Sequence, residues 1–442
     1  MNSNLYGSSS INKILLKIAP PVMLAQLIQA LYNIVDSFFI GKYNQNSLTA
    51  LSIVYPLQLL MIAIAVGSGV GINTRMAYSL GVGDNQKCKD YAGVGTILGV
   101  VLWIIFALIS FFIMPLFARM STSSEEVIND VIVYGRIVCV GSIGIFLESI
   151  WSKILQAKGD MKTPMIDQIV GAVVNIVLDR ILIFGIGSFK GMGIAGAALA
   201  TIIGQIISCL IVMKKGAYKP PKVNTFKTYL KNIYISGFPN ILMQSAYTFY
   251  ILGLNLILSG FSDQAVTALG LYYKWQTIFF IPLGALQTCI VPVVSFNYAS
   301  KNLKRCNKTL YLSLLYGVIL MAIGTLCFET IPEQMLRVFT KDEEVIKIGA
   351  YGFHFIGVSF IPMVTSLIFP VFFQAIGYSI RSSLLTVVRT VVLFVPLGYI
   401  FSRFGLDYFW LTFIFTETIT SIVGFILFIK YLKNNNLRLK DC

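Results

Sequence analysis

The chain consists largely of long apolar runs that are separated by short polar segments. Each run holds about 20 or more residues, the length of helix that crosses about 30 Å of hydrocarbon. Alternating ten-residue segments, which would indicate membrane-spanning strands, do not occur, so we predict helices. We count twelve runs: 14–40, 49–78, 92–117, 128–156, 163–186, 193–213, 229–258, 266–297, 308–330, 346–376, 383–402 and 408–430.

The second half of the chain repeats the first half at a constant separation of 218 residues. At this separation Pro21 corresponds to Pro239, and residues 156–159 correspond to residues 374–377. One separation shared by positions far apart in the chain indicates a duplicated unit. A unit of this length and hydrophobicity is typical of half a membrane transporter.

The connector between the repeats marks the predicted boundary between two lobes. It carries Pro220-Pro221 among spaced lysines. We therefore predict an N-lobe of residues 1–218 and a C-lobe of residues 219–442, each with six helices. Because each lobe has an even number of crossings, both enter the membrane in the same direction. We expect an all-α fold with a pseudo-two-fold axis along the membrane normal and a central cavity.

The composition supports a location in the bilayer, and the distribution of charge predicts the orientation. Hydrophobic residues make up 56% of the chain, charged residues only 12%, and the mean hydropathy is +0.78. Most of the basic residues behind the net charge of +15 lie in the N-terminus, the even-numbered loops and the C-terminus. Lys and Arg are retained on the cytoplasmic side. We predict a multi-pass protein of the cytoplasmic (plasma) membrane, with both termini cytoplasmic, that contacts membrane lipids and binds no nucleic acid.

Acidic residues inside the predicted spans are the main candidate chemistry, because an ionisable group in a membrane helix is costly and so indicates function. Asp36 and Asp179 lie in the first and fifth runs, whereas the corresponding positions of the second repeat are Leu254 and Leu397. This asymmetry favours an ion site in the N-lobe. Three further acids lie within spans, with roles left open: Glu148, which has Lys153 five residues on, Asp167 and Glu417.

Polar side chains at helical spacing accompany both aspartates and share a helix face with them. These residues are Gln29 and Asn33 before Asp36, Asn175 before Asp179, and the pair Thr201 and Gln205 in the sixth run. Carboxylate, amide and hydroxyl oxygens suit Na⁺. Burial and a neighbouring carboxylate favour a proton shared by two acids. H⁺ and Na⁺ both stay open, and the alternative is that each acid pairs with a nearby base, such as Arg180 beside Asp179.

Nothing in the sequence indicates catalysis or a bound cofactor. The seven cysteines show no CxxC pair and no metal-site spacing. His354 is the only histidine, and the glycine-rich stretch 67–71 lacks the strand that precedes a dinucleotide loop, so helix packing explains it better. We expect no enzymatic activity, no cofactor and no certain metal site. A membrane enzyme that uses Asp36 and Asp179 is the least favoured alternative.

The chain resembles the multidrug and toxic compound extrusion (MATE) family over essentially its whole length. The resemblance is carried by the duplicated twelve-helix layout, Ala19-Pro20-Pro21, Asn33-x-x-Asp36, Gln156-Ala157-x-Gly159 and Asn175-x-x-x-Asp179. It implies a V-shaped antiporter that exports cationic amphipathic drugs and dyes in exchange for H⁺ or Na⁺. It also implies an ion site at Asp36, Asn175 and Asp179, with Thr201 as a looser match, and a bend at Pro20 and Pro21. We expect a monomer.

The substrate cavity is expected to be lined by Gln29, Asn33, Gln205, Gln244 and Lys274. Gln244 stands where some members of the family carry an acid, and Lys274 fits either a cavity-lining charge or a snorkelling side chain. A flippase for lipid-linked precursors, from the same wider superfamily, is the alternative function. It is kept open by the membrane-embedded bases Arg75, Arg136, Lys153, Lys274 and Arg389.

Overall fold

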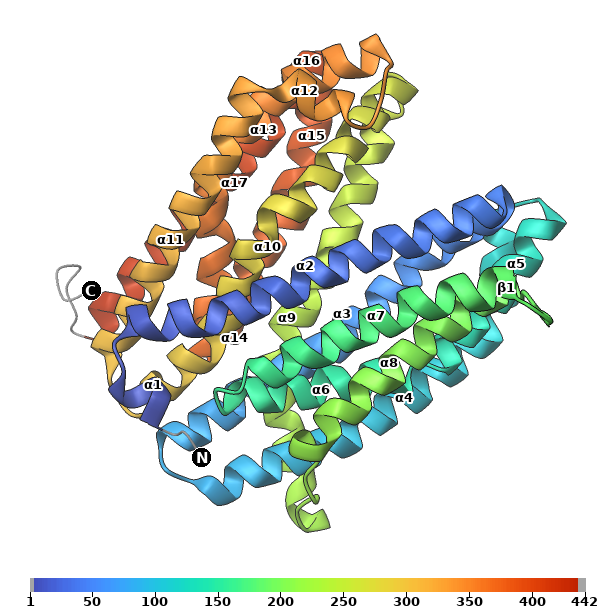
Figure 1. The fold of residues 1–442 in the computed structure, drawn as a ribbon. Helices are drawn as coiled ribbons and strands as arrows, with labels where there is room; N and C mark the ends of the chain where they lie inside the picture. Colours follow the sequence, from blue (N-terminus) through green and yellow to red (C-terminus); the bar gives the residue numbers. More distant parts are fainter. Residues whose placement is uncertain (1–3, 436–442) are drawn as a thin grey trace. The chain divides into compact units, whose positions relative to one another are not determined.

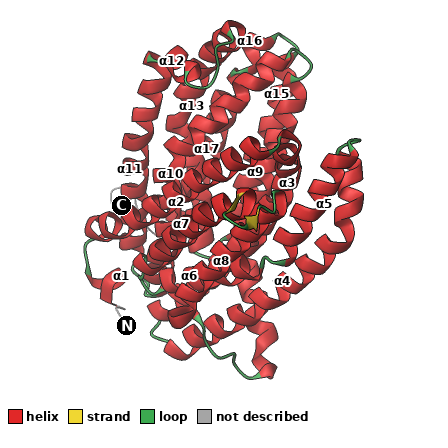
Figure 2. Cartoon of the chain, turned by 45° about the vertical axis from the view of Figure 1, so that its right-hand side comes forward, coloured by secondary structure: helices red, strands yellow, loops and turns green. Residues whose placement is uncertain are grey.

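The computed structural model describes residues 4–435 and is almost wholly helical (Figures 1 and 2). Within that range the strands form one antiparallel hairpin, β1 Gly185–Ile186 with β2 Phe189–Lys190. The helices are α1 Asn4–Ser8, α2 Ile11–Tyr43, α3 Gln45–Gly81, α4 Asn85–Ser121, α5 Glu125–Val140, α6 Ile143–Ala157, α7 Lys162–Phe184, α8 Ile194–Gly216, α9 Val223–Leu258, α10 Asp263–Ala299, α11 Leu303–Thr330, α12 Pro332–Arg337, α13 Glu343–Ala375, α14 Ser379–Val387, the π-helix η1 Val388–Phe394, α15 Val395–Ser402, α16 Leu406–Phe409 and α17 Leu411–Asn434.

The predicted all-helical membrane fold is confirmed, and each predicted run lies mainly on helix, although the run 163–186 ends in β1. Among the described residues ten helices are long and apolar enough to cross a membrane, and the bent pair α5 and α6 adds an eleventh span. The remaining predicted run, 163–186, is α7, which carries Asp167 and Asp179 inside its apolar sequence. The outermost residues of the predicted cytoplasmic termini, 1–3 and 436–442, lie outside the described residues.

The helices form two compact units whose divisions fall inside α2 and α9. Unit 1 contains residues 20–241, and unit 2 contains residues 6–19 and the chain from residue 242 onward. Both divisions lie close to prolines, at Pro20-Pro21 and at Pro239, which correspond in the repeat. The predicted lobe boundary after residue 218 describes the sequence repeat and stays a prediction.

Close backbone contact joins the first part of α9 to α3 in unit 1. A Cβ atom on Gly71 would lie 2.3 Å from the carbonyl oxygen of Ile233, and one on Gly237 would lie 2.5 Å from that of Gly67. Because real Cβ atoms do not approach so closely, only glycine fits at these positions. The helix-packing interpretation of residues 67–71 is confirmed.

A break between α5 and α6 sets the direction of α6 in unit 1. The two helices differ by 41°, whereas the corresponding residues of the second repeat form the single helix α13. Carbonyl groups freed by a break need partners inside a membrane. Trp103 Nε1 donates to the Val140 carbonyl oxygen at 2.8 Å, and Ser142 Oγ donates to that of Cys139 at 2.6 Å. The break, whose free carbonyl groups accept these hydrogen bonds, sets the position of α6, which carries Glu148.

Unit 2 is built around α13, which packs against α10, α11 and α17. The N-terminal segment of the chain is attached to this unit by an arginine. Arg305 Nη2 donates to the carbonyl oxygens of Tyr6 and Ser9, each at 2.7 Å, and its Nε donates to Asn297 Oδ1 at 2.9 Å. The start of α2 is therefore held by unit 2, while the rest of the helix belongs to unit 1.

Replacement of Gly71 by leucine is expected to destabilise unit 1, because the new side chain meets the α9 backbone, which has no room to move. Overpacking of this kind costs about 1–3 kcal/mol. The measurement is the melting temperature of the purified protein in detergent. Gly270→Ala is the matched control, since a Cβ there meets nothing within 4 Å, and it should melt at or slightly above the parent temperature. Equal melting of both variants would contradict the contact.

Candidate functional site

Two aspartates meet inside unit 1. Asp36 of α2 and Asp179 of α7 are joined by a side-chain hydrogen bond, and their exposed fractions are 8% and 0%. An ionised carboxylate only accepts hydrogen bonds, so a bond between two carboxyls requires a proton on one of them. Within residues 4–435 the Oδ1 atom of each aspartate has no hydrogen-bond partner. The pair therefore keeps acceptor capacity for a further proton or a cation.

Asn175 and Thr201 lie beside this pair. With its amide oriented to donate to the carboxylate, Asn175 Nδ2 lies 3.3 Å from Asp179 Oδ2, and its Oδ1 accepts from the backbone N–H of Thr201 at 3.2 Å. α7 and α8 come close enough for this because Gly204 faces the Gly171 carbonyl oxygen, with only 2.8 Å available to a Cβ. The structure thus brings together the four residues predicted for ion coupling.

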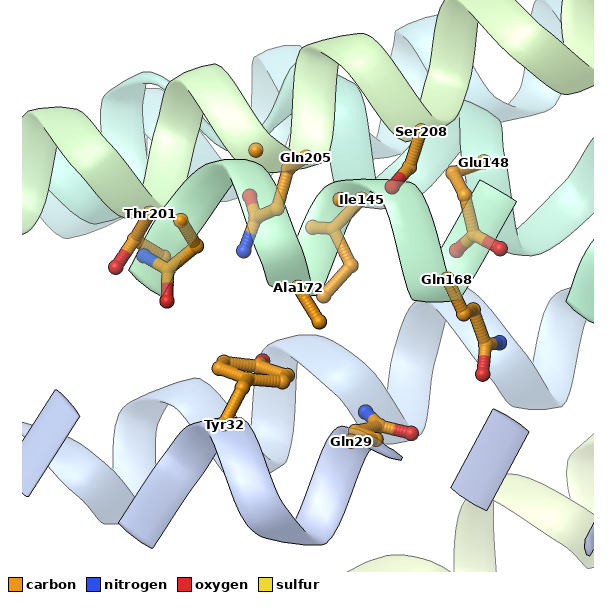
Figure 3. Close-up of a pocket in the computed structure, with 12 residues that line it drawn as sticks. Gln29, Tyr32, Ile145, Glu148, Gln168, Ala172, Thr201, Gln205 and Ser208 are labelled. Carbon is orange, nitrogen blue, oxygen red and sulfur yellow. The ribbon is translucent and has the colours of Figure 1, made fainter. Parts of the chain in front are cut away.

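A small cavity extends from Asn175 and Thr201 to Glu148 within unit 1 (Figure 3). Its volume is about 80 Å³, which suits a few water molecules or one ion and is far below the 300–1,000 Å³ of drug sites. Figure 3 shows Gln29 and Tyr32 of α2 facing the helices that carry Thr201 and Gln205. The lining residues are Gln29, Tyr32, Ile145, Glu148, Gln168, Gly171, Ala172, Asn175, Thr201, Gly204, Gln205 and Ser208.

A second pair of acids lies at this cavity. Glu148 of α6 lines it, and a side-chain hydrogen bond joins Glu148 to Asp167 of α7, which is fully buried. Ser152 Oγ lies between them, 2.8 Å from Glu148 Oε1 and 3.2 Å from Asp167 Oδ2. Lys153, the base considered as a partner for Glu148, donates to Gln156 Oε1 at 3.0 Å. Sequence reasoning left both acids without a role.

The remaining predicted residues are dispersed. Gln29 and Gln205 line the small cavity, whereas Asn33 is exposed and is not among its lining residues. Gln244 and Lys274 belong to unit 2, and Lys274 is exposed, with its Nζ 5.0 Å from the ring centroid of Phe339. The assignment of these residues to a substrate cavity stays a prediction.

The alternative in which Asp179 pairs with a nearby base is not observed. Arg180 is exposed, and its guanidinium lies 5.0 Å from the centroid of the Phe184 ring. No ion pair between Asp179 and Arg180 occurs within residues 4–435. Asp179 therefore has a second carboxyl, and not a cation, as its charged neighbour.

Unit 2 carries different chemistry at its core. Leu254, which corresponds to Asp36, is fully buried and packs against Gly398. The buried charges of this unit are Arg389 of η1 and Glu417 of α17, with side-chain exposures of 7% and 0%. Arg389 donates to both carboxylate oxygens of Glu417, with its Nη2 2.6 Å from Oε1 and its Nε 3.0 Å from Oε2. Glu417 is thus paired, and unit 2 has no carboxyl pair at this position.

The embedded bases do not gather into a site for an anionic headgroup. Arg75 Nε donates to the Asn232 carbonyl oxygen, and Arg136 Nε donates to that of Phe111. Arg389 is neutralised by Glu417. Two of these bases are thus held by carbonyl oxygens inside α9 and α4 and one by a buried acid, so the geometry gives no support to the flippase alternative.

Comparison with known proteins agrees with this fold. The family model MatE matches residues 21–181 and 239–400, one match in each repeat. Multidrug export protein MepA of Staphylococcus aureus is 24% identical over 413 residues, which cover 91% of this chain and 90% of that protein. A FAD transporter of Shewanella oneidensis is 24% identical over 404 residues, covering 88% of each. A MATE crystal structure in complex with MaL6 superimposes with a TM-score of 0.90 at 23% identity, covering 98% of this chain and 99% of that one.

Breaking the Arg389 pair is expected to destabilise the protein strongly. Arg389→Met leaves a buried, unpaired carboxylate, which costs about 3–5 kcal/mol, whereas replacing both partners by apolar residues is often neutral. The double variant Arg389→Met with Glu417→Leu should therefore recover most of the lost melting temperature.

Arg337→Met is the control, because Arg337 pairs with Glu343 at the surface, with exposures of 48% and 71%. A surface pair contributes about 0–1 kcal/mol, so this variant should melt close to the parent. A double variant that melts as low as Arg389→Met alone would contradict the buried pair as the cause.

Proposed function

Because the chain belongs to the MatE family, we propose that it is a secondary active multidrug efflux antiporter of the plasma membrane. It exports cationic amphipathic compounds in exchange for H⁺ or Na⁺, acts as a monomer, and carries out no chemistry on its substrate. Relatives named as multidrug export proteins support the substrate class, and the membrane-spanning helices support the location.

The hydrogen-bonded pair of Asp36 and Asp179 carries this proposal. Two carboxyls inside a helical membrane unit are costly unless they hold a cation, and each keeps an unpartnered oxygen atom. Asn175 and Thr201 fix the position of Asp179. The pair therefore offers a place where an ion binds and neutralises buried charge, which is what coupling requires.

Ion binding is linked to the transport cycle through α2. Asp36 lies on the part of α2 that belongs to unit 1, while residues before Pro20-Pro21 belong to unit 2. Proline removes a backbone N–H and weakens the helix at that point. Charge neutralisation at Asp36 then biases the bend, and one ion that moves inward across 100 mV supplies about 2.3 kcal/mol.

The proposed orientation places both termini and the connector in the cytoplasm. A cysteine introduced at Lys219 should therefore resist an impermeant thiol reagent in intact cells and react after permeabilisation. A cysteine at Ser188, an exposed position in the hairpin after α7, is the matched control and should react without permeabilisation. The reverse labelling pattern would overturn the orientation.

Ethidium transport into proteoliposomes tests the function directly. Uptake should follow either an imposed pH gradient or an imposed Na⁺ gradient, and the effective gradient identifies the coupling ion. FAD is the second substrate to include, because one relative is a FAD transporter. Transport of FAD without transport of ethidium would show that the substrates are not cationic amphipathic compounds. If neither compound is transported under either gradient, the proposal is contradicted.

Asp36→Asn keeps size and hydrogen-bonding capacity but removes the titratable group. Folding and drug binding should persist, and gradient-driven efflux should fall to the level of empty liposomes, because the ion no longer alters the equilibrium between states. Asp179→Asn should behave alike, and the double variant should be little worse than either single one. Efflux at the parent rate by Asp36→Asn would remove the ion-site assignment. Leu254→Asp added to Asp36→Asn should not restore efflux.

A further inference from the structure

The small cavity of unit 1 is lined by Glu148 of one carboxyl pair and by Asn175, the neighbour of Asp179 in the other pair. Asn175, which contacts Asp179, and Thr201 line one part of it, and Glu148, which is bonded to Asp167, lines another. Figure 3 shows Glu148 and Gln168 together at one end and Thr201 at the other. A space of about 80 Å³ thus runs from Glu148 to Asn175, which contacts Asp179, and it is enough for a short file of water molecules.

Two amide side chains that line the cavity have an oxygen atom without a hydrogen-bond donor. The Oε1 atoms of Gln168 and Gln205 are fully buried and have no partner within residues 4–435. Both residues line the cavity, and buried polar atoms without a partner are unusual in native proteins. A water molecule in or beside the cavity would supply the donor that these two amide oxygens lack.

The Glu148 pair also needs a proton. A hydrogen bond between Glu148 and Asp167 requires one carboxyl to be protonated, and no salt bridge within residues 4–435 includes either residue. Asp167 has its Oδ1 bonded to the backbone N–H of Gln168 at 2.7 Å, and its Oδ2 lies 3.2 Å from Ser152 Oγ. Asp167 is thus fixed, and Glu148 is the member that faces the cavity.

We propose that Glu148 and Asp167 form a second proton-binding station, connected through the cavity water to Asp36 and Asp179. One proton leaves the Asp36 pair for a water molecule, and that water releases a proton to Glu148. The first pair gains one negative charge, the second loses one, and the water is unchanged. The proposal rests on the proposed antiport function and assigns a path for the coupling proton inside unit 1.

Infrared spectroscopy of the purified protein tests the station without transport. The C=O stretch of protonated carboxyls should titrate in the double variant Asp36→Asn with Asp179→Asn, which has lost the first pair. Adding Glu148→Gln or Asp167→Asn to that variant should remove this signal. Asp130→Asn is the control, because Asp130 accepts from Ser47 and does not line the cavity, and it should leave the signal intact. A signal that survives removal of Glu148 and Asp167 would overturn the proposal.

Proton-driven ethidium efflux supplies the second readout. Glu148→Gln should slow efflux roughly tenfold or more, the size of effect expected for a lost proton-transfer group, while ethidium affinity stays at the parent value. Asp130→Asn should transport at the parent rate. Parent efflux by Glu148→Gln would overturn the station as part of the path.

The two proposals fail in different ways. If Asp36→Asn transports normally while the infrared signal of Glu148 and Asp167 remains, the coupling function is wrong and the second carboxyl pair stands. If Asp36→Asn abolishes efflux while the infrared signal does not depend on Glu148, the coupling function stands and the second station is wrong.

Discussion

Hydrocarbon supplies no hydrogen-bond partners, and this constraint explains where the polar groups of the chain lie. Each group that leaves the regular helix pattern inside a membrane needs a partner from the protein. The break after α5 is stabilised by Trp103 and Ser142, and Arg389 lies against Glu417. The carboxyls of unit 1 bond to one another. Acid pairs satisfy this constraint only by retaining protons, which makes them the chemically responsive part of the fold.

Duplication produced two units with similar helices and different buried charge. Among the described residues, unit 1 contains two carboxyl pairs, and unit 2 contains one buried arginine–carboxylate pair and an apolar Leu254. An arginine stays charged at all accessible pH values, so the pair in unit 2 holds a fixed structure, whereas the pairs in unit 1 change charge when a proton leaves. The same architecture therefore holds an ion pair of fixed charge in one unit and protonated carboxyl pairs in the other.

The sequence predicted the helices and the repeat, because apolar run length and a constant separation can be read along the chain. The meeting of Asp36, Asn175, Asp179 and Thr201 in one site was implied by the family resemblance, since helical spacing places residues on a face but does not specify which faces meet. The sequence did not predict the pairing of Glu148 with Asp167. That pairing depends on the direction of α6 after a break at Gly141 and Ser142. The spacing of residues along the chain specifies neither the angle between α5 and α6 nor the contact between the two acids. The available signal was the presence of two acids, Glu148 and Asp167, inside predicted spans.

The prediction also treated each repeat as one lobe, while contacts divide the chain inside α2 and α9. This difference has a consequence for biosynthesis. Residues 6–19 are synthesised long before their partners Asn297 and Arg305. Unit 1 likewise lacks part of its helix packing until residues 223–241 of α9 are inserted. Neither unit is complete when the first repeat has been synthesised. Helix surfaces that later pack against the second repeat must until then contact lipid or an insertion factor.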